Sequence, residues 1–579
     1  MSLIKRHQPT LMSKKYYSML LGGTLTMMMS SLMVMSDQLI AGAVIGSNAV
    51  AGVTLVTPLH SFAVFLGTLF SLGIPILYSK EMGRFHKKGA DRVFGFGLFM
   101  TITVGILMFV AISFLGDLYL QSSSPDKEVL VHAKDYLYWM RFTILVMPLQ
   151  MLMGEVVHGD GDEFISTIAN VVQGLGNIVL SITLSYFIGM KGIGFASFIF
   201  HIVSILILLI HFGRKRNSLR WNLYFSFGLL KKVVRYSMID SSSFLYISIL
   251  TATFNAFISH QYGSKYLILA SVISLCREGQ LMFDGIGEAV CPIFGVYVGE
   301  KNHKGLRTSY ALANRTAIVE GVIVTVALLI IAPFAPGFLH VTNPEMSRWI
   351  VIGIRLTAIG STFTSLLYLI TSYYLTIDQI KIGVIACALR DVVFSVLLGV
   401  ALGKIFGVAG MFAGLGVAPA VAFGIFMLVI RLRYGKADCP LLLSKVPGHK
   451  NITNFELSIE PKKIINLQQE VGSLLENNNV DQLSVNKVKL LIEELYMLIW
   501  EKNEEKSVLG EMTIYIDPDQ IRIISKDNGV LFDISEEDVD VTSITSYLVS
   551  AYMEKLGENR QYLTTMSFNR STYVIKTQS

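Results

Sequence analysis

A single aspartate, Asp37, stands inside the apolar segment SSLMVMSDQLIAGAVIG. An ionised side chain in the middle of a bilayer costs about 2.5–3.5 kcal/mol on insertion scales. The nearest basic residues in the sequence, Lys15 and Lys80, fall at the predicted membrane faces. A carboxyl group kept away from water binds a proton readily, which is what a proton-coupled carrier requires. The alternative is a neutral, hydrogen-bonded structural acid.

A polar stripe on the segment 163–188 offers a second set of candidate residues. Gln173, Asn177 and Ser181 recur at four-residue intervals and therefore share one face of a helix. A polar face on an apolar helix must meet protein or water. It either lines a cavity or holds helices together by hydrogen bonds worth about 1 kcal/mol each.

Charged residues also fall inside apolar segments of the second half of the chain. Together with Gln173, we take them as candidates for contact with a substrate in a cavity; they are Glu278, Asp284, Glu288, Arg355, Arg390 and Asp391. Glu278 and Arg390 are candidate partners in a buried ion pair.

The composition describes the elements that must hold these side chains. Of 579 residues, 52% are hydrophobic and 16% are charged, against about 25% charged in a soluble domain. This excludes a plain soluble enzyme, a disordered chain and a fibrous protein. The four cysteines have no CxxC spacing, which argues against a zinc ribbon and a disulfide scaffold. Residues 1–436 carry a net charge of +14 and residues 437–579 one of −8, as a membrane body with an acidic soluble tail would.

Hydropathy predicts an all-α membrane protein with twelve transmembrane helices in two six-helix halves, followed by a C-terminal cytoplasmic α+β domain. The predicted helices lie near 17–44, 50–78, 93–116, 133–157, 163–188, 192–212, 233–261, 266–298, 311–333, 349–376, 382–403 and 408–432. The predicted domains are an N-terminal half (1–212), a cytoplasmic linker (213–232), a C-terminal half (233–436), a second linker (437–450) and an ATPase-like domain (451–579).

The distribution of basic residues sets the expected orientation. With the N-terminus inside, the inner segments contain 22 Lys and Arg residues and the outer segments contain 6. We therefore expect a multi-pass protein of the bacterial cytoplasmic (inner) membrane, embedded in the lipid bilayer, with both termini in the cytoplasm.

Two short segments hint that the halves are related. The second predicted helix ends in PILYSKE (75–81) and the eighth in PIFGVYVGE (292–300), and a basic loop follows each. Related halves around a central cavity are typical of transporters that alternate access. Chance similarity between short apolar strings is the other explanation.

The tail has a different pattern. FELSIE (455–460) alternates like a strand, and the residues of 461–476 and 484–502 have helical periodicity. EMTIYID (511–517) and IRIISKD (521–527) flank a Pro-Asp turn and predict a β-hairpin.

Three segments resemble the multidrug and toxic compound extrusion (MATE) family. They are MSDQLIAGAVIGSNAVAGVTLVTPL (35–59), GDGDEFISTIANVVQGLGNIVLS (159–181) and GMKGIGFASFIFH (189–201). The resemblance covers about 420 residues and agrees in helix number and in the two halves.

By this resemblance, Asp37 matches the acid of the first helix that binds the coupling cation. Asn177 belongs to the same cluster, and Ser197 stands where the family has a threonine. Ser181 stands where the family has a second aspartate, which weakens the case for Na⁺ as the coupling ion. The two alternatives are coupling by a proton on Asp37 alone and loss of ion coupling. The resemblance implies small-molecule organic cations as substrates, and we expect no resident cofactor or metal and no nucleic-acid partner.

In the tail, VKLLIEELYMLIWEKN (488–503) and SKDNGVLFD (525–533) resemble the histidine-kinase and anti-sigma-factor ATPase fold. The resemblance gives Glu493 the water-activating role and assigns Asp527, Gly529 and Asp533 to the adenine loop. Met497 stands where that fold has an Mg²⁺-binding Asn, and a thioether is a poor ligand for Mg²⁺. We expect a degenerate module that binds a cytoplasmic protein or self-associates, with adenine-nucleotide binding as the alternative.

These features predict a secondary transporter, not an enzyme, that exports organic cations or other xenobiotics by proton antiport. The alternatives are a transporter-like receptor or regulator that signals through the tail, and a lipid flippase. An ABC-type pump is excluded because no GxxxxGK[ST] spacing is present. Met497 argues against a membrane-tethered kinase.

Overall fold

The computed structural model describes residues 10–83, 87–123, 126–160, 162–214, 217, 219–449, 451–504, 506, 508–532, 561–563 and 568–577. The chain forms two compact units. One contains residues 24–285 and 316–433. The other contains residues 1–23, 286–315 and 434–579. These units do not coincide with the predicted domains, because residues 286–315 group with the tail.

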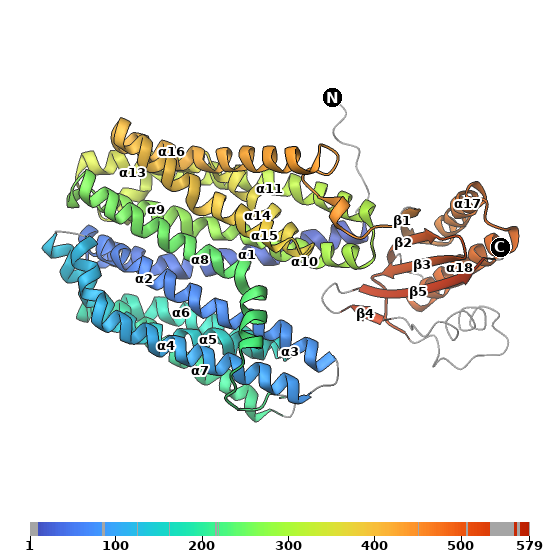
Figure 1. Cartoon of the computed structure of the whole chain (residues 1–579), viewed down its shortest axis with the longest axis horizontal. Helices are drawn as coiled ribbons and strands as arrows, with labels where there is room; N and C mark the ends of the chain where they lie inside the picture. Colours follow the sequence, from blue (N-terminus) through green and yellow to red (C-terminus); the bar gives the residue numbers. More distant parts are fainter. Residues whose placement is uncertain are drawn as a thin grey trace. The chain divides into compact units, whose positions relative to one another are not determined.

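Long helices dominate the first 434 residues (Figure 1). They are α1 (Leu11–Val44), α2 (Ser47–Ser71), α3 (Gly73–Gly83), α4 (Lys87–Ser123), α5 (Lys127–Gly159), α6 (Glu163–Ile188), α7 (Met190–Leu209), α8 (Phe227–Gln261), α9 (Ile268–Gly279), α10 (Asp284–Gly299), α11 (His303–Ile331), α12 (Ala335–Phe338), α13 (Pro344–Ala358), α14 (Ser361–Thr376), α15 (Ile380–Ala388) and α16 (Phe394–Tyr434).

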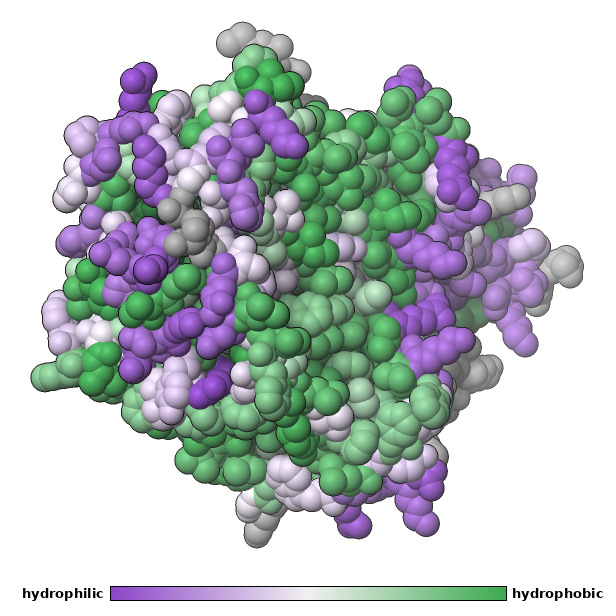
Figure 2. All heavy atoms as spheres, turned by 60° about the vertical axis from the view of Figure 1, so that its left-hand side comes forward, coloured by the Kyte–Doolittle hydropathy of each residue, from purple (hydrophilic) through white to green (hydrophobic). Residues whose placement is uncertain are grey.

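Among the described residues, nine helices are long and apolar enough to cross a membrane. The number rises to ten if α13 and α14, which bend by 45° at their junction, form one span. The predicted number of twelve is therefore not confirmed. Figure 2 shows hydrophobic residues running together over a broad area of one face, with hydrophilic residues at its margins. Such an apolar surface is expected where a protein meets lipid.

Two glycines with left-handed backbone each connect a pair of helices. Gly189 (φ 60°) joins α6 to α7, and Gly407 (φ 66°) interrupts α16, which consists of two helices joined there. A Cβ atom at Gly192 or at Gly410, each three positions later, would collide with the backbone of the preceding helix. The two helices of each pair are therefore antiparallel and closely packed.

A second feature also recurs in both halves. The predicted second helix is divided at Leu72 into α2 and α3, and the predicted eighth helix is divided by a 3₁₀ turn, Gln280–Phe283, into α9 and α10. The Pro-Ile strings that hinted at a duplication lie in α3 and α10. Both observations support related halves.

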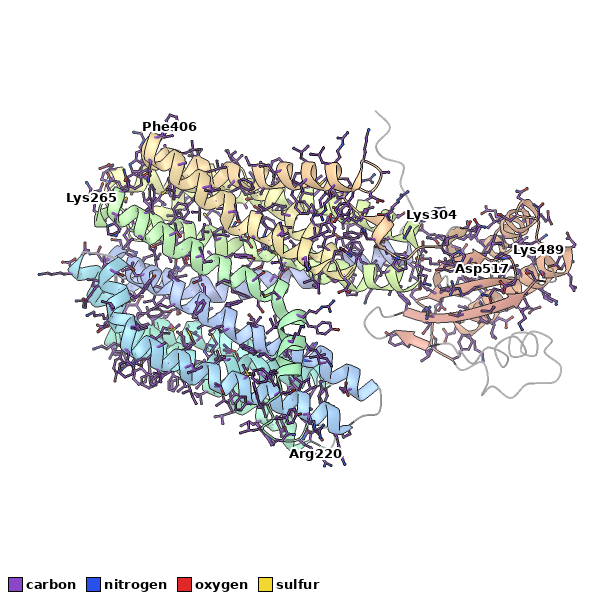
Figure 3. All side chains as sticks on the ribbon, viewed as in Figure 1. Arg220, Lys265, Lys304, Phe406, Lys489 and Asp517 are labelled. Atoms are coloured by element: carbon purple, nitrogen blue, oxygen red, sulfur yellow. The ribbon has the colours of Figure 1, made fainter. Side chains whose placement is uncertain are left out.

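Within the unit of residues 24–285 and 316–433, helices α4, α5, α6 and α7 pack together, while α2 packs against α8 and α9 of the other half (Figure 1). One hydrophobic core runs through this contact and includes the fully buried Leu55 of α2 and Phe254 of α8. Figure 3 shows Arg220 at the end of the bundle opposite to Lys265 and Phe406.

The described residues of the tail form a five-stranded antiparallel sheet of order β1-β2-β3-β5-β4 with two helices. The elements are β1 (Ile452–Ile459), α17 (Pro461–Asn477), α18 (Gln482–Lys502), β2 (Val508–Ile516), β3 (Gln520–Asp527), β4 (Gln561–Leu563) and β5 (Phe568–Lys576). The predicted hairpin is confirmed as β2 and β3. Apolar residues of α17 recur at helical spacing, as Ile464, Leu467 and Val471 do, and bury that face in the core.

A buried charge network ties this sheet to the turn between α10 and α11, which belongs to the same unit. Lys526 of β3 has no exposed surface; its Nζ lies 2.7 Å from Oε2 of Glu300 and 3.2 Å from Oε1 of Glu511. Arg570 adds an Nε contact to Oε1 of Glu300 at 3.4 Å. The Tyr515 hydroxyl donates to the Glu300 carbonyl at 2.7 Å. The sheet face opposite the two helices is thus docked onto this turn.

Candidate functional site

A cavity of about 260 Å³ lies in the bundle and includes Asp37 in its lining. This volume is near the lower end for small-molecule sites. Helices of both halves line it: α1, α2, α5, α6, α7, α8 and α9. Its wall on α5 carries Tyr136, Met140, Thr143, Met147 and Met151, which lie on one helical face. The wall is therefore apolar and adaptable, with polar groups gathered beside Asp37.

The two oxygens of Asp37 differ. Oδ2 accepts hydrogen bonds from the Tyr136 hydroxyl at 2.6 Å and from the Ser197 hydroxyl at 3.3 Å. Oδ1 is buried and has no hydrogen-bond partner among the described residues. Oδ2 is occupied as an acceptor, so a proton or cation from the cavity would bind at Oδ1.

A chain of hydrogen bonds leads to this carboxyl group from the polar stripe of α6. Ser181 donates to Oδ1 of Asn177 at 2.7 Å, and Nδ2 of Asn177 donates to Ser197 at 3.1 Å. Ser197 then donates to Asp37. The structure thus brings together the four residues predicted for cation coupling. Ser181 reaches the acid through two intermediates and is itself fully buried.

Gln173, also predicted from the stripe, lines the cavity and orients His201. Nδ1 of His201 lies 2.7 Å from the Ser197 carbonyl, which only accepts, so Nδ1 carries a proton. Nε2 lies 3.2 Å from Nε2 of Gln173, which only donates, so this ring nitrogen is an acceptor. His201 is therefore neutral in this arrangement.

Three titratable residues of the lining were not predicted from the sequence: His60, Tyr136 and His201. A single histidine or tyrosine in an apolar helix that is rich in aromatic residues does not by itself indicate a functional site. The available signal for His60 and His201 was that each is a titratable residue in a predicted membrane segment.

Glu278, predicted as a cavity residue, lies in α9 and lines the same cavity as Asp37. Its side chain is buried. Oε1 accepts a hydrogen bond from Ser274 at 3.1 Å, and Oε2 has no partner among the described residues.

The suggested pairing of Glu278 with Arg390 is wrong, because Arg390 binds its sequence neighbour Asp391 with two hydrogen bonds of 2.7 Å. Arg277 reaches the same carboxylate at 2.7 Å, and Arg390 also stacks on the ring of Tyr368, 3.5 Å from its centroid. A buried charge cluster of this kind fixes the packing of α9 against the segment 389–393. Neither Arg390 nor Asp391 is among the residues that line the described cavity.

The remaining cavity candidates lie elsewhere. Asp284 begins α10 and Arg355 is in the last turn of α13; both are exposed and neither lines the described cavity. Glu288 is in α10, and its side chain lies outside what the structure describes.

In the tail, the loop after β3 is held by the protein itself. Oδ1 of Asp527 accepts from the Gly529 amide at 2.9 Å and from Nδ2 of Asn569 at 3.0 Å. Glu493 is exposed and accepts a hydrogen bond from Gln468 at 2.9 Å. Met497 packs against the hydrophobic core.

The fourth nucleotide candidate, Asp533, lies outside the described residues. The structure therefore places one candidate acid in the sheet and one on an exposed helix face, and it does not test their predicted roles.

A bundle of membrane-length helices around a cavity is the architecture of a membrane transporter, and this cavity contains buried carboxyl oxygens that have no hydrogen-bond partner among the described residues. Residues 24–211 match the family model described as MatE. This part of the chain therefore resembles the MATE family, whose members are transporters rather than enzymes.

Known proteins resemble a longer part of the chain. Multidrug export protein MepA of Staphylococcus haemolyticus (strain JCSC1435) is 21% identical over 392 residues, which are 66% of this chain and 85% of that protein. The inward-facing structure of a multidrug resistance MATE family transporter of the MOP superfamily has a TM-score of 0.64 at 18% identity. The match covers 70% of this chain and 94% of the chain in that structure.

A second solved structure is that of a MOP superfamily transporter from Pyrococcus furiosus Vc1 (DSM3638), described as having a binding pocket of reverse polarity that suggests a different function. Its TM-score is 0.60 at 19% identity, and the match covers 73% of this chain and 96% of the chain in that structure. At these identities the likeness shows the fold alone.

Proposed function

We propose that this protein is a secondary transporter that exports organic cations in exchange for protons by alternating access. The observation that carries the proposal is the Asp37 carboxyl group. One of its oxygens is held by Tyr136 and Ser197, and the other is buried at the cavity without a partner among the described residues. A proton on Asp37 and a cation in the cavity would compete for the same negative charge, and such competition is the basis of antiport.

The arrangement supports H⁺ over Na⁺ as the coupling ion. A hard metal cation prefers several oxygen ligands, with carboxylates to balance its charge. Near Asp37, Ser181 stands where a second carboxylate would help, and Oδ1 of Asn177 already accepts from Ser181. A proton needs one open carboxylate oxygen, and Oδ1 of Asp37 provides it.

The cavity's charge supports an organic cation as the substrate. The lining contributed by the described residues contains two carboxylic acids and no Lys or Arg. The methionines of α5 can adapt to apolar bodies of different shapes. This polarity weighs against the flippase alternative, because the phosphate headgroup of a lipid would need basic partners.

We place the protein in the bacterial cytoplasmic membrane with both termini in the cytoplasm. The excess of Lys and Arg on the predicted inner segments supports this orientation. Arg220, at one end of the bundle, would then be cytoplasmic, whereas Lys265 and Phe406, at the other end, would face outward (Figure 3).

For the tail we propose a docking and regulatory role rather than ATP hydrolysis. The buried network around Lys526 supports docking, since a charged residue without exposed surface implies a defined contact. Met497, which packs against the hydrophobic core, offers only a thioether at that position, and a thioether is a poor Mg²⁺ ligand. If this domain regulates transport, the receptor alternative takes a modified form: one chain both transports the substrate and senses a signal.

Transport by the purified full chain in proteoliposomes tests the proposal. Under an imposed pH gradient, the wild type should move an amphipathic cation such as ethidium, and Asp37→Asn should reduce this movement to that of protein-free vesicles. Asp117→Asn removes an exposed carboxylate on α4 and is the matched control; it should transport normally. Unchanged transport by Asp37→Asn would remove Asp37 from the coupling mechanism.

A further inference from the structure

The cavity contains a second carboxyl group in the same state as Asp37. Glu278 is 4% exposed. Its Oε1 accepts a hydrogen bond from Ser274, and its Oε2 is buried without a partner among the described residues. Asp37 likewise has one oxygen held by donors and one buried oxygen without a partner in the described part of the chain. Each acid is therefore oriented by the protein and left with one site for a proton.

A chain of two hydrogen bonds connects Glu278 in the second half to Gln38, the residue that follows Asp37 in the first half. Gln38, which follows Asp37 in α1, donates through Nε2 to the Ser274 hydroxyl at 3.2 Å. Ser274 in turn donates to Glu278. Gln38, Ser274 and Glu278 are all buried, so the orientation of the Glu278 carboxyl group depends on the position of α1 in the other half.

The described lining residues of the cavity include no Lys or Arg. The other titratable lining groups are His60, Tyr136 and His201, and His201 is neutral by its hydrogen bonds. Arg277 is next to Glu278 in the sequence, but its guanidinium binds Asp391 and Gln280. Asp37 and Glu278 line the same cavity. Burial away from water favours the protonated form of each acid, and repulsion between two carboxylates further disfavours the doubly ionised state, so an empty cavity favours protons on both.

We infer that Glu278 is a second proton-exchanging group of the transport site, and that each cycle exchanges two protons for one organic monocation. This inference rests on the proposed function. Both acids are protonated when the cavity is empty of substrate. A monocation balances one of the two carboxylates, and the second carboxylate is left to interact with the same cation from the opposite half.

The charge balance of this exchange is measurable. Two protons that enter while one monocation leaves carry one net positive charge inward. If Glu278 no longer ionises, one proton exchanges for one monocation and no net charge moves. Transport by the wild type should therefore respond to the membrane potential, whereas transport by a variant with a neutral residue at position 278 should respond to the pH gradient alone.

The test uses full-length protein in proteoliposomes, with ethidium as the probe and a potassium gradient with valinomycin to set the potential. With no pH gradient, a potential negative on the proton-receiving side should drive ethidium exchange by the wild type. Glu278→Gln should lose this response and keep exchange driven by a pH gradient, with the proton-to-ethidium ratio falling from about two to about one. Glu278→Asp keeps a carboxyl group and should retain the response.

The controls separate this inference from the proposed function. Glu476→Gln removes an exposed acid in α17 and should behave like the wild type. A wild type that ignores the potential, or a Glu278→Gln variant that still follows it, would overturn the two-proton assignment while leaving Asp37 as the coupling acid. If the wild type shows no proton-driven ethidium movement at all, the proposed function fails, and the inference fails with it.

Discussion

Replacing Lys526 with methionine removes the ammonium group that lies between Glu300 and Glu511. Lys526 has no exposed surface, and the two acids are 3% and 2% exposed. Removing one partner from a buried ion pair costs about 3–5 kcal/mol, because it leaves an uncompensated buried charge. Arg570 remains 3.4 Å from Glu300 and offsets part of this cost. We therefore expect the lower end, about 3 kcal/mol, which corresponds to a roughly 100-fold increase in opening of the docked sheet.

Hydrogen exchange of the full chain in detergent, followed by mass spectrometry, measures this opening directly. The amides of β2 and β3 should lose about two orders of magnitude of protection in Lys526→Met. Lys489→Met is the matched control; Lys489 forms a longer, partly exposed pair with Glu476 at 3.7 Å, and its loss should cost about 0–1 kcal/mol.

A double variant keeps this reasoning testable if Lys526→Met folds poorly. In the double variant, Lys526→Met with Glu511→Met, the carboxylate of residue 511 that lost its partner is also removed, and Glu300 remains paired with Arg570. Replacing a buried ion pair by apolar residues is near neutral, so much of the lost protection should return. Equal protection of β2 and β3 in wild type, Lys526→Met and the control would refute the claim that this network holds the sheet in place.

Two further predictions concern pH and backbone strain. Burial lowers the pKa of Lys526, but attraction to Glu511 and then Glu300 outweighs it and raises this pKa above its ordinary value of 10.5. The stability that Lys526 contributes should be fully present below pH 10.5 and be lost as the pH rises through its higher folded-state pKa. The difference in apparent unfolding temperature between wild type and Lys526→Met should thus stay constant from neutral pH to about pH 10 and shrink above it, and a difference that shrinks on acidification instead would contradict this. Gly407→Ala should lower the apparent unfolding temperature, at a cost of about 1–3 kcal/mol, because alanine does not readily adopt φ 66° with ψ −153°. Gly424→Ala, where a Cβ atom meets nothing within 4 Å, is its control, and equal effects of the two substitutions would exclude backbone strain as the cause.

Local sequence patterns predicted the residues of the candidate coupling site better than the hydrogen-bond partners of these residues. The apolar context of Asp37 and the spacing on α6 pointed to Asp37, Asn177 and Ser181, and the structure joins them through Ser197. Tyr136 donates the shortest hydrogen bond to Asp37 from 99 positions away, and no local signal marks it. The Tyr136 hydroxyl becomes part of the site only because α5 packs near α1, and this tertiary contact cannot be predicted from the local sequence.

Hydropathy also did not predict where the helices are broken. A window average treats α13 and α14 as one apolar run, although they bend by 45° where they meet. The 3₁₀ turn at 280–283 is equally invisible, because its residues are as apolar as their neighbours. Bends depend on how each backbone packs against other helices, and composition does not contain this information.

The burial of Lys526 illustrates the same limit in the tail. In a strand pattern, a lysine predicts a solvent-facing position. Its partner Glu300 is 226 positions away and was predicted only as the end of a helix. The strands themselves were predictable because alternation of apolar residues is a local property.

The single-residue connections at Gly189 and Gly407 restrict how the bundle can rearrange. Two antiparallel helices joined by one residue can neither slide past each other nor rotate independently, since the connection has no slack. Helices α6 and α7 must therefore travel as one block, and so must the two parts of α16. Any large displacement has to be absorbed where the connection between helices is long. The connection between α7 and α8, whose described residues 219–226 form neither helix nor strand, is long enough to absorb it.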